Sequence, residues 1–139
     1  MIEFELSNIS ISGFDTQKIR EWVKSVIIKE KAKPGAIQFI IINDEEMLEL
    51  NNTYLKHDTL TDIITFNYNT ELGGISGDIY ISHDRVLENA EQYNVSEFNE
   101  LLRVMVHGVL HLIGYDDHDD SSMRRMRDRE NYYLSLFDF

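Results

Sequence analysis

Alternating and continuous apolar runs along the chain predict four β-strands. Residues 2–9 alternate apolar and polar side chains, as in a strand with one buried face. Residues 36–42 form a short run rich in β-branched side chains, which favours a buried strand. Residues 63–68 and 78–82 are two more short apolar runs, and the glycine-rich segment 69–77 predicts a turn that joins them as a hairpin.

Apolar residues spaced three and four apart predict five helices. Asp15 or Thr16 is a suitable N-cap for the first helix, and Asn43 or Asp44 for the second. The predicted helices cover about 16–31, about 45–56, 84–93, the stretch between Ser96 and Gly114, and 121 to about 136. The resulting order, β-α-β-α-β-β-α-α-α, predicts an α+β fold in which a mixed four-stranded sheet packs with about five helices. Its first βαβ unit predicts parallel strands, and we expect one domain over residues 1–139.

Composition narrows the class of protein. Hydrophobic residues make up 42% of the chain, which is enough for a core and too many for a disordered chain. Because the chain has no cysteine, any metal must be held by His, Asp or Glu. The first ten residues do not resemble a signal peptide, and no apolar run approaches the roughly 20 residues of a membrane span. We therefore expect a soluble, cytoplasmic protein.

The net charge of −12 argues against binding nucleic acid through the whole surface. Basic residues are instead concentrated in two segments, 18–33 and 124–129. Each segment is interpreted as the solvated face of a helix, with contact to phosphates as the alternative.

The segment 104–120, VMVHGVLHLIGYDDHDD, carries the candidate chemistry. His107 and His111 are four residues apart, so on a helix they lie on one face, one turn apart. The surrounding side chains are apolar nearly all round the helix, which predicts burial, and buried histidines need partners. With His118, beyond Gly114, as third ligand, a bound metal would keep one open position, as a catalytic zinc requires.

The motif differs from the HExxH pattern of zinc proteases, because Gly108 stands where the glutamate base would be. A base must then come from elsewhere in the chain, or a metal-bound water must suffice, since a bound Zn²⁺ lowers the pKa of that water to about 7. Glycine inside a helix costs roughly 1 kcal/mol relative to alanine. We expect close approach of a neighbouring element at Gly108 to offset that cost.

The stretch from His107 to Asp116, HGVLHLIGYD, resembles the signature of the YbeY-type rRNA maturation factors, regarded as metal-dependent endoribonucleases. Two upstream blocks are also similar to that family: the first comprises residues 50–54, Asp58 and residues 61–66, and the second comprises residues 77–82. The resemblance implies a single-domain zincin-like metal hydrolase with one Zn²⁺, other divalent metals remaining open. It also implies single-stranded RNA as substrate, in rRNA precursors and the maturing small ribosomal subunit.

Two positions depart from the family pattern. The family's third histidine directly follows the Tyr-Asp pair, where this chain has Asp117, with His118 one residue later. We take His118 as the third ligand, because imidazole suits Zn²⁺ and a loop absorbs a one-residue shift, with Asp117 as the alternative. Leu55 replaces an arginine thought to act on the phosphate. No catalytic residue is assigned, and Lys56 and Asp62 are the secondary candidates.

A different class of function is consistent with the same residues. The metal would then be structural, and the protein a non-catalytic ribosome-assembly factor that binds RNA or ribosomal proteins. The acidic surface suits a basic protein partner. Four protein ligands would indicate such a structural site, and three ligands with an open position would indicate an enzyme.

Overall fold

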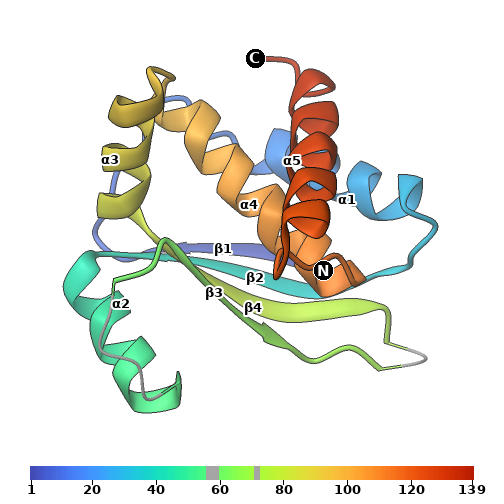
Figure 1. Ribbon diagram of the computed structural model, residues 1–139, viewed down its shortest axis with the longest axis horizontal. Helices are drawn as coiled ribbons and strands as arrows, with labels where there is room; N and C mark the ends of the chain where they lie inside the picture. The colour runs from blue at the N-terminus through green and yellow to red at the C-terminus, as the bar shows by residue number, and fades with distance from the viewer. Residues whose placement is uncertain (56–59, 71–72) are drawn as a thin grey trace.

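The chain forms four β-strands and five α-helices in a computed structural model, which describes residues 1–55, 60–70 and 73–139 (Figure 1). In chain order the elements are β1 (Ile2–Leu6), α1 (Thr16–Lys29), β2 (Pro34–Ile42), α2 (Asp44–Leu50), η1 (Asn51–Leu55), β3 (Ile63–Asn67), β4 (Ile75–Ser82), α3 (His83–Tyr93), α4 (Glu97–Ile113) and α5 (Asp120–Ser135). The predicted order of strands and helices is confirmed. Among the described helices, none has the length and apolar character needed to cross a membrane.

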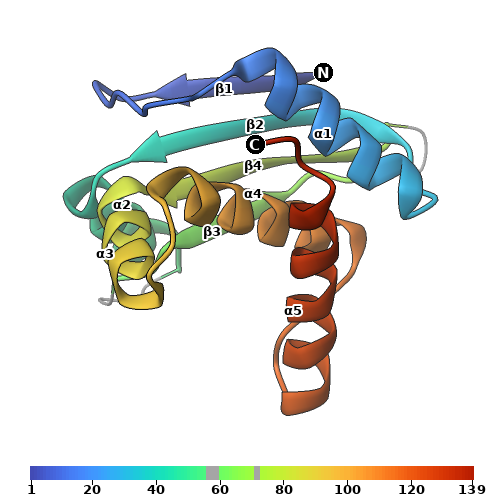
Figure 2. The same cartoon turned by 90° about the horizontal axis from the view of Figure 1, so that it is seen from above.

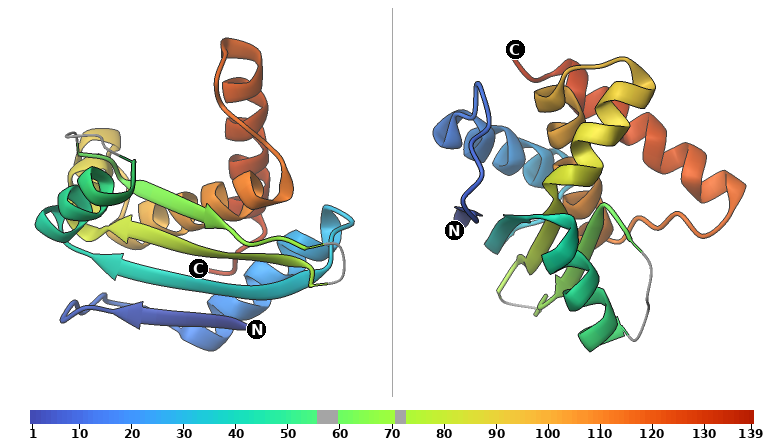
Figure 3. Two further views of the ribbon diagram at one scale, coloured as in Figure 1. Left: turned by 90° about the horizontal axis from the view of Figure 1, so that it is seen from below. Right: turned by 90° about the vertical axis from the view of Figure 1, so that its left-hand side faces the viewer.

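The strands form one mixed sheet in the order β1-β2-β4-β3 (Figure 3). The pairs β1–β2 and β2–β4 are parallel, and β3 runs antiparallel to β4, with Ile64 opposite Tyr80. The predicted parallel pair around the first helix and the predicted hairpin are both present. The α+β fold with a mixed four-stranded sheet is therefore confirmed.

Most helices cover one face of this sheet. Figures 1 and 2 show α4 lying across that face with α1, α3 and α5 around it, while α2 lies on the opposite face. The main core joins the sheet to these helices and includes Phe39, Ile41, Ile79, Ile81, Val106, Val109 and Leu110. A smaller cluster under α2 contains Ile40, Ile42, Met47 and Ile64. The sheet and α4 thus form a rigid base for side chains on the exposed stripe of α4.

Two glycines allow α4 to approach the sheet closely. A Cβ on Gly108 would lie 2.9 Å from Cδ1 of Ile63 and 3.0 Å from Cγ2 of Ile79, so the close approach expected at this glycine is observed. A Cβ on Gly77 would overlap the carbonyl oxygen of Phe66 and lie 3.0 Å from the side chain of Leu112. The turn predicted over 69–77 was therefore wrong at its end: β4 begins at Ile75, and Gly77 serves helix–sheet packing.

The predicted helix over 45–56 is divided in the structure. An Asn43 capping box begins α2, which ends at Leu50, and the chain continues as a π-helical turn, η1, to Leu55. Asn51, at the junction, is buried. Lys56 lies outside the described residues. The first strand is also shorter than predicted and ends at Leu6.

Candidate metal centre and substrate cavity

Helix α4 places the two histidines side by side. Its N-cap is Ser96, whose hydroxyl accepts a hydrogen bond from the Asn99 amide at 3.0 Å, and its C-cap is Gly114. Gly114 has φ +131°, in the region that favours glycine, and its N–H donates to the carbonyl oxygen of Leu110. The uninterrupted helix between these caps brings His107 and His111 onto one face, one turn apart.

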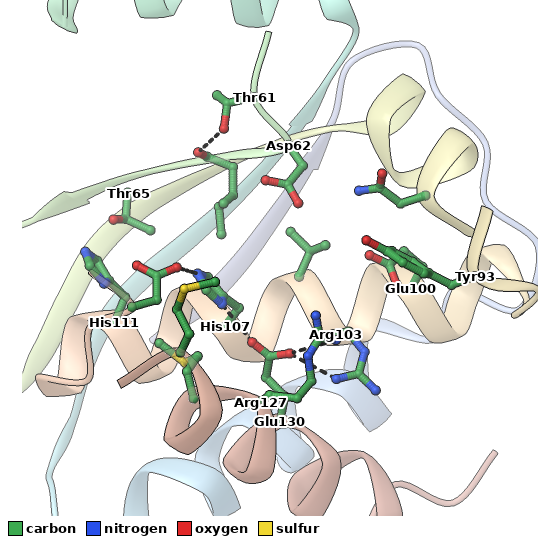
Figure 4. A pocket seen from close by; sticks show the side chains of 16 residues that line it. Thr61, Asp62, Thr65, Tyr93, Glu100, Arg103, His107, His111, Arg127 and Glu130 are labelled. Atoms are coloured by element: carbon green, nitrogen blue, oxygen red, sulfur yellow. Dashed lines mark hydrogen bonds and ion pairs between the residues drawn. The ribbon is translucent and has the colours of Figure 1, made fainter. Parts of the chain in front are cut away.

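That face borders a cavity of about 460 Å³ (Figure 4). One wall is formed by β3 and the residues just before it, called the strand side below, and the others by helices α3, α4 and α5. Thr61, Asp62 and Thr65 approach it from the strand side, across from the histidines of α4. The residues that line the cavity are Thr61, Asp62, Ile63, Thr65, Asn89, Tyr93, Glu100, Arg103, Val104, His107, His111, Asp117, Met123, Met126, Arg127 and Glu130. The cavity is therefore rich in groups that bind metals and anions.

His107 is held in one orientation by a carboxylate. Its Nδ1 lies 2.8 Å from Oε2 of Glu130, and its Nε2 lies 3.6 Å from Oδ2 of Asp117. Burial alone would lower the pKa of His107, but the hydrogen bond and negative charge of Glu130 outweigh it, and the pKa lies above its usual value. Because Nδ1 is engaged by Glu130, Nε2 is the nitrogen left to meet a ligand in the cavity.

Glu130, on α5, connects the histidine to two arginines. Its side chain is only 6% exposed; Oε1 accepts a hydrogen bond from Nη1 of Arg103 at 3.0 Å and lies 3.6 Å from Nη1 of Arg127. Burial raises the pKa of Glu130, but the hydrogen bond from His107 and the charges of the nearby arginines lower it by more. The net pKa is therefore below its usual value. The carboxylate is thus stabilised in its charged form inside the protein.

Glu130 was not among the site residues predicted from the sequence, although the sequence contains a signal for it. Glu130 occupies the same stripe of α5 as the buried Met126, Tyr133 and Leu134. A charged residue in an apolar stripe is rarely buried without a charged partner. That anomaly pointed to a partner such as the histidines of the preceding helix.

The structure places the two candidates for the third ligand differently. Asp117 lines the cavity with His107 and His111, whereas His118 is not among the lining residues and its side chain is 71% exposed. His118 instead lies beside two acidic neighbours: its Nδ1 is 2.5 Å from Oδ1 of Asp116, and its Nε2 is 3.3 Å from Oδ2 of Asp119. Asp119 is also the N-cap of α5, which anchors this part of the loop. The geometry therefore favours the alternative, Asp117.

The donor groups at this end of the cavity fit a metal ion. Two imidazoles and a carboxylate are ligands that suit Zn²⁺. The Glu130–His107 pair is also the arrangement by which proteins orient a metal-binding histidine, with a carboxylate on the nitrogen that faces away from the ion. Across residues 1–55, 60–70 and 73–139, however, no three His, Asp or Glu side chains already converge as a complete ligand set.

The other residues considered from the sequence differ in whether they line the cavity. Asp62 lines the cavity, and burial raises the pKa of its carboxyl group despite the opposing charge of His107. Burial likewise raises the pKa of Glu100 at the same cavity. Leu55 is 44% exposed on η1 and is not among the residues that line the cavity. Of the two secondary catalytic candidates, Asp62 is therefore placed at the cavity, and Lys56 lies outside the described residues.

Comparison with known proteins shows which family this chain is similar to. A family model described as Endoribonuclease YbeY matches residues 1–138. Endoribonuclease YbeY of Flavobacterium psychrophilum is 50% identical over 117 residues, or 84% of this chain and 82% of that protein. Endoribonuclease YbeY of Flavobacterium johnsoniae is 42% identical over 135 residues, or 97% of this chain and 91% of that protein. The solution structure of TM1509 from Thermotoga maritima superimposes with a TM-score of 0.68 at 29% identity, over 97% of this chain and 87% of that one. The resemblance found in the sequence is thereby confirmed.

Proposed function

This chain belongs to the endoribonuclease YbeY family, and we propose that it is a metal-dependent endoribonuclease that hydrolyses phosphodiester bonds in single-stranded RNA. The name of the relatives supports RNA cleavage. The observation that carries the metal dependence is the geometry of His107: Glu130 engages its Nδ1, while its Nε2 faces Asp117 at the cavity.

In this proposal, His107, His111 and Asp117 hold one Zn²⁺ ion. His118, the third ligand expected from the sequence, would have to break its contacts with Asp116 and Asp119 and turn toward the cavity to bind the ion. A bound Zn²⁺ would supply Lewis-acid chemistry, polarising a phosphoryl oxygen and lowering the pKa of water to about 7. Glu130 fixes the ring of His107 and raises its basicity as a ligand.

Asp62 is the group that we place as proton acceptor. It faces the cavity from the strand side, opposite the histidines of α4 (Figure 4). Because burial raises the pKa of its carboxyl group, the carboxylate is a stronger base than that of an exposed aspartate. It is suited to take a proton from the attacking water at a carboxylate oxygen.

The biological part of the proposal follows the family resemblance. We place the activity in the cytoplasm, on rRNA precursors and in the assembly or quality control of the small ribosomal subunit. A chain with a net charge of −12 repels RNA at long range. The substrate must therefore be held by local cationic groups or by ribosomal partners close to the cleavage site.

The central test is cleavage of a labelled single-stranded RNA by the Zn²⁺-loaded protein, before and after removal of the metal with a chelator. The metal-loaded protein should cleave, chelation should abolish cleavage, and added Zn²⁺ should restore it. His111→Ala should lose activity in parallel with zinc content, while Arg124→Gln, on the exposed surface of α5, should lose neither. Stoichiometric zinc with full activity in His111→Ala would contradict the mechanism. Stoichiometric zinc without any cleavage by the wild-type protein would favour the ribosome-assembly factor.

A further inference from the structure

Two arginines line the cavity beside the histidines: Arg103 from α4 and Arg127 from α5 (Figure 4). They are the only Lys or Arg side chains among the described residues that line it. The carboxyl groups lining the same cavity are those of Asp62, Glu100, Asp117 and Glu130. Within the described part of the chain, a polyanionic RNA strand that enters this cavity therefore meets permanent positive charge only at these two guanidinium groups.

Arg103 belongs to the same helical stripe as the histidines. It lies four residues before His107, as His107 lies four residues before His111, so the three side chains follow one another at successive turns of α4. The Arg103 side chain is 21% exposed, so part of its surface remains accessible. The stripe thus leads from the two imidazoles directly to a guanidinium group.

A single carboxylate connects that guanidinium to the metal-binding end of the cavity. Glu130 accepts from Nδ1 of His107 on Oε2 and from Nη1 of Arg103 on Oε1, at 2.8 and 3.0 Å. Nη2 of Arg103 also donates to Oδ1 of Asn131 at 2.7 Å. A guanidinium has five N–H groups in a planar fork, so these two bonds orient Arg103 and leave donors for an anion.

Arg127 is the second and more exposed of the two arginines. Its side chain is 56% exposed, and its Nη1 lies 3.6 Å from the same Glu130 oxygen that Arg103 contacts. That separation is an ion-pair distance but is too long for a good hydrogen bond. Because both guanidinium groups approach one oxygen atom, they lie next to each other, and the weaker contact of Arg127 is readily exchanged for a phosphate.

We propose that Arg103 and Arg127 form a phosphate-binding subsite that holds the RNA backbone beside the phosphodiester being cleaved. Guanidinium groups bind phosphate oxygens through paired, charge-assisted hydrogen bonds, which matches the adjacent pair seen here. The subsite explains how a strongly acidic protein retains RNA in this cavity. The inference rests on the proposed endoribonuclease activity and names how that activity binds its substrate.

The test compares Arg127→Gln with Arg124→Gln, which removes an exposed arginine from the same helix but outside the cavity lining. With Zn²⁺-loaded protein and a single-stranded RNA oligonucleotide, Arg127→Gln should raise KM about tenfold, the effect of one charge-assisted hydrogen bond. Its zinc content should be unchanged. The plot of log(kcat/KM) against log salt concentration has a negative slope, and its magnitude should decrease by about 0.7 for the lost phosphate contact. Arg124→Gln should match the wild-type protein within about twofold.

Arg103→Gln and Arg103→Lys extend the test to the deeper arginine. Lysine keeps the charge but loses the fork, so Arg103→Lys should raise KM less than Arg103→Gln. Melting temperature and zinc content show whether either variant has disturbed Glu130. If Arg127→Gln and the double variant with Arg103→Gln bind and cleave RNA like Arg124→Gln, the subsite is refuted.

The proposed function can fail separately from this inference. If the wild-type protein binds zinc but cleaves no RNA, the endoribonuclease proposal fails. Fluorescence anisotropy with the same labelled oligonucleotide then decides the subsite. Weaker binding by Arg127→Gln than by Arg124→Gln supports it, and equal binding overturns it.

Discussion

Glu130 Oε2 lies 2.8 Å from Nδ1 of His107, and this contact joins α5 to the first histidine of α4. It gives a nearly buried carboxylate a cationic or hydrogen-bonding partner and fixes the direction of the imidazole. It also links two residues that are 23 positions apart in the sequence. Several properties of the site should therefore depend on a side chain that is not itself a proposed metal ligand.

Glu130→Gln should weaken metal binding without removing any proposed ligand. Glutamine keeps the size of the side chain but loses the charge that orients His107 and raises its basicity. Loss of such a partner typically costs 10–100-fold in metal affinity. Competition titration of Zn²⁺ against a chromophoric chelator measures the effect. Asp128→Asn, an exposed acid on the same helix, is the matched control and should keep the wild-type affinity. Equal affinities for the two variants would show that Glu130 has only a structural role.

The third ligand can be identified by substituting the two adjacent loop residues, Asp117 and His118, one at a time. Asp117→Ala should lower zinc affinity strongly, because it removes the carboxylate that faces Nε2 of His107. His118→Ala should leave zinc affinity within a few-fold of the wild-type value, because that ring is 71% exposed and lies between acidic neighbours. Isothermal titration with Zn²⁺ distinguishes the two cases. The reverse ranking would establish His118, the ligand expected from the sequence.

Local periodicity predicted most of what positions this site. The apolar spacing identified the strands and helices, and the i, i+4 relation between His107 and His111 required only that α4 be a helix. Even Gly108 was interpretable, because a glycine in a buried helix implies a close neighbour, found here at Ile63 and Ile79.

What sequence reasoning missed depends on packing and on loop conformation. Glu130 reaches the cavity because α5 packs against α4, and although its apolar stripe signals a buried charge, the sequence does not show which element it meets. Arg127 belongs to the basic segment 124–129, for which contact to phosphates was the alternative, but the sequence does not show that this side chain lines the cavity. Asp117 rather than His118 faces the cavity because the loop is anchored by the Asp119 cap and His118 pairs with Asp116. Ligand preference alone favoured imidazole, but a one-residue shift in a loop reverses which side chain points inward.

Asp62→Asn should reduce cleavage with little effect on zinc content. Loss of a general base typically costs 10²–10⁴-fold in rate, and asparagine preserves the shape of the side chain. Single-turnover cleavage of RNA together with zinc analysis separates catalysis from metal loading. Asp78→Asn, on β4 and outside the cavity lining, should retain the wild-type rate. A rate for Asp62→Asn within about threefold of wild type would remove Asp62 from the mechanism and leave the proton to another acceptor.

Glu30 should make folding stability depend on pH on the acid side. Its carboxylate, 9% exposed, accepts hydrogen bonds from the hydroxyls of Tyr115 (2.6 Å) and Tyr133 and from Nη1 of Arg129 (3.2 Å). Burial raises its pKa, but these hydrogen bonds outweigh burial, and the net pKa is below the usual value. The stabilisation is therefore present above the unfolded pKa, about 4.3, and is lost as pH falls through the lower folded pKa.

Glu30→Gln should accordingly lower the free energy of unfolding at pH 7 by roughly 2 kcal/mol, the range for hydrogen bonds to a charged group. It should also flatten the loss of stability between about pH 5 and pH 3 relative to the wild-type protein. Urea unfolding at several pH values measures both effects. Glu91→Gln, at an exposed position of α3, should follow the wild-type curve. A Glu30→Gln curve parallel to that of the wild type at every pH would contradict this role.

Gly108→Ala should destabilise the protein even though alanine favours helix formation. A Cβ at this position would lie 2.9 Å from Cδ1 of Ile63 and 3.0 Å from Cγ2 of Ile79, closer than such atoms pack. Overpacking of this kind typically costs about 1–3 kcal/mol, and because Ile79 is fully buried and has little room to move, we expect this cost to exceed the gain of about 1 kcal/mol in helix propensity. Urea unfolding measures the net effect.

Ile63→Val tests the cause of that destabilisation, because valine lacks the Cδ1 atom that the new methyl group would meet first. The double variant Gly108→Ala with Ile63→Val should recover part of the lost stability, so the two changes should be non-additive. If the free energies simply add, the strain at Gly108 does not arise from Ile63. The remaining neighbour, Ile79, would then set how closely α4, and with it the histidine pair, approaches the sheet.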